Sequence, residues 1–126
     1  MLKNYLYRLY DTIISRGNIE LELLVFDDQS KQRGSIEGRL RFYNGSLLEF
    51  DEVVLLRDEQ IVKLRYAYHY QSSSGELIFR YDNVPHHQDI STYPHHKHIG
   101  STVESAQPPD LSEVLREIEL LIYDAD

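Results

Sequence analysis

The chain has 126 residues, enough to bury one hydrophobic core and too few for two, so we expect a single domain over residues 1–126. The absence of cysteine excludes a disulfide framework, a thiolate nucleophile and a cysteine-based metal site. The formal net charge of -8 argues against broad, non-specific nucleic-acid binding and suits a partner with a basic surface. The N-terminal stretch has no uninterrupted apolar run, so we expect a cytoplasmic protein that does not contact a membrane.

The first third of the chain predicts a helix followed by a strand. Apolar side chains recur every three or four residues over residues 2–16, which is typical of an amphipathic helix, and Gly17 is a good helix stop. From Asn18 the apolar period changes to two and continues to the pair Asp27-Asp28. That alternation predicts a half-buried strand.

Two further strands follow a polar loop. Residues 36–43 alternate cleanly between apolar and polar side chains, and Asn44-Gly45 is a strong hairpin signal because its backbone readily takes positive φ. A third strand runs over about residues 47–56. Its alternation slips near residues 51–53, which predicts a β-bulge.

The fourth strand is long and rich in tyrosine, and the loop SSSGE returns the chain into a fifth strand. If that hairpin is centred between Ser73 and Ser74, Tyr68 lies opposite Phe79 and Arg65 lies opposite Asp82. This register is a hypothesis, because a slip of one residue would turn every side chain to the other face. It places the following side chains on one face of the sheet: Arg65, His69, Arg80 and Asp82.

The segment FRYDNVPHHQDISTYPHHKHIG, residues 79–100, holds five of the six histidines. We interpret the part after the fifth strand as an extended loop with two prolines. A last helix follows, with Asp110 as its N-cap and Glu113 three residues later, the spacing of a capping box. The fold class is therefore α+β: an N-terminal helix, a five-stranded antiparallel β-meander, a histidine-rich loop and a C-terminal helix.

The histidine segment has the groups needed for metal-independent phosphoryl transfer to an RNA 2′-hydroxyl. Imidazoles supply a general base and a general acid near neutral pH, and a cation holds the phosphate. The candidate catalytic residues are His86, His87, His95, His96, His98 and Asp82. The candidate substrate-binding residues are Arg80, Arg65 and Lys97 for phosphate, Tyr81 for base stacking, and Asn83 and His69 beside them.

Two alternatives stay open. Alternate residues of an extended chain point to the same side, so His96 and His98, together with His86, can hold Zn²⁺ or another divalent transition metal. Such a site would make the protein a metal-binding protein or a metal-dependent hydrolase. In the other alternative the polar side chains lock the loop through hydrogen bonds to the backbone, and the protein is a non-enzymatic interaction module.

The run LIFRYDNVPHHQDISTYPHHKHIG, followed by a proline-containing segment and the helix LSEVLREIELLI, resembles the TumE-type family of bacterial toxin–antitoxin proteins. The likeness covers the second half of the chain well, and the first half only in its order of a helix before strands. It implies a toxin that a helix-turn-helix antitoxin neutralises. The order of elements is also similar to that of small ribonuclease toxins, although the acidity of this chain departs from their usual basic character.

These observations lead to one main hypothesis: the toxin of a toxin–antitoxin pair, with RNA as its target and the histidine segment as its site. No cofactor is needed for the acid–base chemistry, whereas Zn²⁺ or a similar ion is the alternative. An edge strand or the terminal helices offer a surface for a homodimer.

Overall fold

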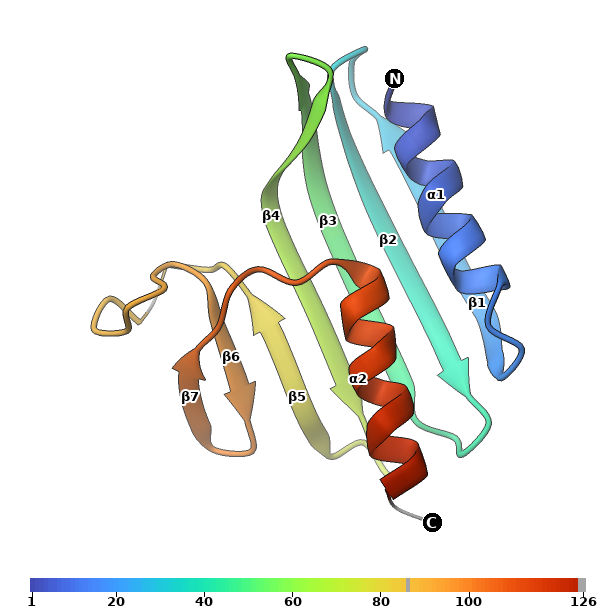
Figure 1. The fold of residues 1–126 in the computed structure, drawn as a ribbon, viewed down its shortest axis with the longest axis vertical. Helices are drawn as coiled ribbons and strands as arrows, with labels where there is room; N and C mark the ends of the chain where they lie inside the picture. The colour runs from blue at the N-terminus through green and yellow to red at the C-terminus, as the bar shows by residue number, and fades with distance from the viewer. Residues whose placement is uncertain (86, 125–126) are drawn as a thin grey trace.

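The chain forms two helices and one antiparallel sheet in the computed structural model, which describes residues 1–85 and 87–124 (Figure 1). The α+β class predicted from the sequence is confirmed. In chain order the elements are α1 (Leu2–Ile14), β1 (Ile19–Asp28), β2 (Arg33–Phe42), β3 (Leu47–Arg57), β4 (Gln60–Gln71), β5 (Leu77–Asp82), β6 (His96–Ile99), β7 (Thr102–Ser105) and α2 (Leu111–Asp124).

The sheet is a meander in which each strand pairs with its neighbours in the sequence, in the order β1 to β7. The prediction of five strands is wrong, because the segment expected to be a loop contributes β6 and β7. Lys97 of β6 pairs with Tyr81, so β6 uses the hydrogen-bonding edge that β5 would otherwise expose. The chain then turns at Gly100, whose φ is +57°.

Both helices cover the same face of the sheet, as Figure 1 shows, and the core lies between the two layers. Three tyrosines of β4 belong to this core, where Tyr68 and Tyr70 are almost fully buried. We call the opposite face, which no helix covers in the described part of the chain, the open face. The main buried apolar residues are Leu9, Ile13, Ile36, Leu40, Phe42, Leu48, Phe50, Tyr66, Tyr68, Tyr70, Phe79, Leu111, Val114, Leu115, Ile118 and Ile122.

The predicted register of the β4–β5 hairpin is wrong by two residues. Tyr68 lies opposite Tyr81, and Ala67 rather than Arg65 lies opposite Asp82. A bulge between Tyr70 and Gln71 lengthens the return loop on one side. Since the error is an even number of residues, Arg65, His69, Arg80 and Asp82 still share one face of the sheet.

Local signals in the sequence have mixed outcomes. The bulge expected in the third strand is not there: β3 and β4 shift register between Val53 and Val54, but Val53 pairs with Arg65 and Val54 with Lys63, so the extra residue is Leu64 of β4. The capping box forms as expected, because the Glu113 amide donates to Asp110 Oδ1 at 2.9 Å and the Asp110 amide donates to Glu113 Oε1 at 3.3 Å. The β2–β3 turn differs from a two-residue turn: only Gly45 has positive φ, and the Phe42 amide bonds to the Ser46 carbonyl across three loop residues.

Candidate functional site: a histidine cluster on the open face

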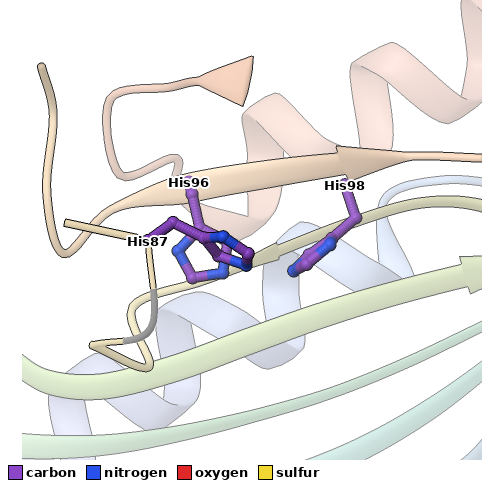
Figure 2. Close-up of side chains that lie close together, drawn as sticks. All are labelled: His87, His96 and His98. Carbon is purple, nitrogen blue, oxygen red and sulfur yellow. The ribbon is translucent and has the colours of Figure 1, made fainter. Parts of the chain in front are cut away.

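The pairing of β5 with β6 brings predicted site residues together on the open face. Asp82 lies opposite His96, and Arg80 lies opposite His98. Residues directly opposite each other in an antiparallel pair point to the same side of the sheet. His87 reaches the same place from the loop between the two strands, and Figure 2 shows its ring beside those of His96 and His98. We call His87, His96, His98, Asp82 and Arg80 the open-face cluster.

The three imidazoles of the cluster are close and stand edge to face. Ring centroids are 5.0 Å apart for His87 and His96, 5.6 Å for His87 and His98, and 4.8 Å for His96 and His98. The interplanar angles lie between 69° and 79°. One ring nitrogen from each histidine lies within 4.8 Å of the others. The rings therefore point their nitrogens toward a shared volume.

Asp82 lies at the centre of the cluster, and its side chain is only 5% exposed. Its Oδ1 lies 2.8 Å from His96 Nε2 and accepts the Val84 amide at 3.0 Å. Its Oδ2 accepts from Arg80 Nε at 2.9 Å and lies 3.7 Å from His98 Nε2. A buried carboxylate needs such partners, because an unpaired charge is costly away from water.

His96 is the most deeply placed imidazole, with 2% of its surface exposed. Its Nδ1 lies 2.8 Å from the Pro94 carbonyl oxygen, which can only accept, so Nδ1 carries a hydrogen. Its Nε2 faces Asp82. Both nitrogens are thus engaged, and His96 cannot reach a substrate without giving up one partner.

The outer part of the cluster is more accessible. The side chain of His98 is 27% exposed and that of Arg80 is 36% exposed. Burial lowers the pKa of His98, although the Asp82 carboxylate acts in the opposite direction. His69 lies opposite Arg80 on β4, with its Nδ1 3.2 Å from Arg80 Nη1. Burial, and next the Arg80 charge, lower the pKa of His69.

Several predicted site residues lie away from the cluster. His95 is on the helix side, where its Nδ1 lies 3.0 Å from the Tyr66 hydroxyl and its ring stacks on that tyrosine. Burial, and next the charge of His96, lower the pKa of His95. The ammonium of Lys97 and the hydroxyl of Tyr81 both bond to Glu117 of α2, at 2.6 and 2.5 Å. These contacts hold β5 and β6 against the helix layer.

The remaining predicted residues have varied surroundings. Asn83 accepts from the Tyr66 amide at 3.0 Å and donates to the Leu64 carbonyl at 3.1 Å, so its side chain extends the β4–β5 pairing. Arg65 is exposed in β4 and pairs with Val53. His86, which belongs to the predicted catalytic and metal sets, lies outside the described residues.

A hollow of about 330 Å³ adjoins the cluster on the open face, and sequence reasoning missed it. Arg80 belongs to both the hollow and the open-face cluster, and His69 lines the hollow beside it. Burial raises the pKa of Asp51 in this hollow, against the opposing effect of Arg80. The alternating acidic residues of β2 and β3 were the signal in the sequence that could have indicated this hollow. Only the pairing of these strands with β4 brings them close to Arg80. The charged residues that line the hollow are Glu37, Arg39, Glu49, Asp51, His69 and Arg80.

A family model described as toxin TumE matches residues 9–122, which is most of the chain and includes the whole cluster. The chain belongs to the toxin TumE family. The resemblance noted from the histidine segment is therefore confirmed, and it extends over the first half of the chain as well. As a TumE-family protein the chain is a toxin component of a toxin–antitoxin system, with an antitoxin as its partner.

Other comparisons add nothing to the family assignment of this TumE-family chain. Neither the curated proteins nor the solved structures compared with it include a match. Within residues 1–85 and 87–124, neither helix has the length and apolar character needed to span a membrane.

Proposed function

We propose that this TumE-family toxin acts on RNA, breaks phosphodiester bonds at the open-face cluster, and is neutralised by a helix-turn-helix antitoxin. The observation that supports the reaction is the convergence of three imidazoles and a buried carboxylate beside an accessible arginine. RNA carries its own nucleophile, the 2′-hydroxyl, so the protein needs only to move protons and stabilise charge on the phosphate.

Arg80 is suited to hold the phosphate. Its Nε–H is used by Asp82 and one Nη1–H by His69, which leaves three of the five guanidinium N–H groups for a ligand. Because both of these contacts fix the plane of the guanidinium, its free N–H groups are already oriented for two phosphate oxygens. The side chain borders the hollow, through which the RNA backbone would approach.

The reaction breaks one bond and forms one. The 2′-oxygen attacks phosphorus and loses its proton to the cluster, the bond from phosphorus to the 5′-oxygen breaks, and that oxygen takes a proton as it leaves. The products are a 2′,3′-cyclic phosphate and a free 5′-hydroxyl. Since His96 is engaged at both nitrogens, the proton transfers fall to His87 and His98, directly or through a water that they hold.

The test is induced expression in a bacterial host, with growth and total RNA followed together. Wild-type protein should arrest growth and degrade RNA, and His98→Gln and Arg80→Ala should each abolish both effects. Glu104→Gln, an exposed change on β7, serves as the control that retains them. Each variant is checked for soluble expression and an unchanged melting temperature.

Three other results would count against the proposal. Arrest with intact RNA would keep the toxin and remove RNA as its target. Arrest that survives both cluster substitutions would point to the non-enzymatic interaction module. Normal growth with well-expressed wild-type protein would show that the protein is not toxic.

Co-expression with the protein encoded beside the toxin gene tests the partner, which should bind the toxin and restore growth.

A further inference from the structure

The contact between Asp82 and His96 requires a cation. His96 carries its hydrogen on Nδ1, where it faces the Pro94 carbonyl, so the neutral ring has a lone pair on Nε2. That lone pair faces Asp82 Oδ1 at 2.8 Å. Two acceptors at this distance repel unless a positive charge lies with them, and both groups are almost fully buried. Either a proton or a metal ion meets this need.

A proton explains one imidazole, whereas the structure brings three together. His98 Nε2 lies 3.7 Å from the other oxygen of the same carboxylate, and a nitrogen of His87 lies within 4.8 Å of those of both other rings. A single proton between Asp82 and His96 does not explain why two further rings turn nitrogens toward the same volume. A metal ion does, because it takes one lone pair from each ring.

We propose that His87, His96 and His98, together with Asp82, bind one divalent transition-metal ion, and that three nitrogens with one carboxylate oxygen select Zn²⁺. Zinc prefers a tetrahedral set of nitrogen and oxygen ligands at about 2.0–2.2 Å. Imidazole donors also disfavour Mg²⁺ and Ca²⁺, which take oxygen ligands.

The surroundings of the cluster match those of a metal centre. A ligating histidine usually donates its second N–H to a backbone carbonyl, which fixes the tautomer and the ring orientation, and the Pro94 carbonyl does this for His96. Arg80 in turn holds the second oxygen of Asp82 at 2.9 Å. His96 and His98 are fixed on β6, so His87, on the loop, is the ligand that can move to complete the set.

The binding of the ion stands apart from the proposed function, but its catalytic use rests on that function. The three imidazoles and Asp82 fill a tetrahedral site, so catalytic use would require a fifth, water ligand, which would lose its proton near neutral pH and serve as the base for the 2′-hydroxyl. In this arrangement His87 and His98 act by holding the metal. Arg80 keeps its role on the phosphate.

The experiment is a titration of the full, untagged chain, stripped of metal by a chelator and dialysed, with Zn²⁺ in a calorimeter and with Co²⁺ followed by visible absorption. Wild type should bind one ion per chain, give the intense absorption of four-coordinate Co²⁺, and melt at a higher temperature when loaded. His98→Gln and His87→Gln should weaken binding more than about tenfold, since even second-shell losses reach that size. His95→Gln, one residue away on the other face, is the matched control that keeps full binding.

Absence of stoichiometric binding would overturn the proposal, and so would weak binding of several ions or equal losses in His95→Gln. Using the two partly exposed ligands, His87 and His98, avoids dependence on the buried His96, whose replacement can unfold the chain. If zinc-loaded toxin leaves RNA intact, the proposed function is wrong and the metal centre stands. If chelated protein that binds no ion still cleaves RNA, the metal centre is wrong and the proposed function stands.

Discussion

Glu52 shows how one buried charge joins the helix layer to the sheet. Its side chain is fully buried and accepts hydrogen bonds from the hydroxyls of Tyr5 in α1 and Tyr68 in β4. Lys63 lies 3.3 Å from Glu52 and donates to the Pro109 carbonyl at 2.9 Å, just before α2. The extra residue of the bulge, Leu64 in β4, makes this possible, because it turns Lys63 toward the helix side.

Replacing Lys63 with methionine should lower the free energy of unfolding by about 3–5 kcal/mol, because it leaves the Glu52 carboxylate buried without its counter-charge. Urea denaturation followed by circular dichroism measures the loss. Lys3→Met, at an exposed site in α1, is the control and should change stability by less than about 0.5 kcal/mol. Adding Glu52→Gln to Lys63→Met should recover part of the loss, and a single-variant cost under about 1 kcal/mol would contradict this account.

The open-face cluster could be located from sequence, although not in detail. The density of histidines pointed to the segment that forms it, and alternation correctly placed His96 and His98 on one side. Which of His95 and His96 faces the open side could not be predicted, since that depends on the pairing of β6 with β5. Lys97 and Tyr81 look like ligand-binding residues in the sequence, yet both meet Glu117, a partner 36 positions beyond Tyr81.

At the scale of elements, the turn between β3 and β4 is strained. Asp58 and Glu59 form a two-residue turn between the paired residues Arg57 and Gln60, with φ of 52° and 62°. This geometry matches the twist of a hairpin, but side chains with a Cβ disfavour it.

Glu59→Gly should therefore stabilise the protein by about 0.5–1 kcal/mol. The relief of backbone strain favours the folded state, and the greater freedom of glycine in the unfolded chain offsets part of that gain. The melting temperature in a thermal scan should rise by a few degrees. Glu20→Gly, the same exchange inside β1, is the matched comparison and should lower stability by roughly 0.5–1 kcal/mol. A fall in stability for Glu59→Gly would show that the turn is not strained.

The elements that sequence reasoning found are those with a clear apolar period. Strands β1 to β5 and both helices have one apolar side, so their pattern reveals them. β6 reads His-Lys-His-Ile and has no such period. Its position is set by the free edge of β5 and by Lys97 docking on α2, and neither is visible in a local pattern.

The molecule as a whole depends on buried tyrosine hydroxyls that stay protonated. Burial is the largest cause that raises the pKa values of Tyr5, Tyr66 and Tyr68, and the nearby carboxylate of Glu52 adds to it for Tyr5 and Tyr68. In the unfolded chain a tyrosine loses its proton near pH 10. The folded state therefore holds more protons than the unfolded state above that pH.

Below about pH 10, tyrosine ionisation should leave the free energy of unfolding unchanged. As the pH rises further the free energy of unfolding should fall, because proton loss then favours the unfolded chain. Melting temperatures between pH 8 and 11 measure the effect. Tyr5→Phe removes one of these groups, so its melting temperature should fall less steeply with pH, from a lower starting value. A wild-type melting temperature that does not change across this range would rule out the linkage.

The sequential order of the sheet has a consequence for how the protein is made. Every strand pairs only with strands next to it in the chain, so no pairing has to wait for a distant segment. Closing short loops costs little entropy, and proteins dominated by local contacts fold quickly for their class. Strands can thus pair one after another as they leave the ribosome. His96 and His98 come late in that order, so the nascent chain stays without its histidine cluster until most of the sheet has formed.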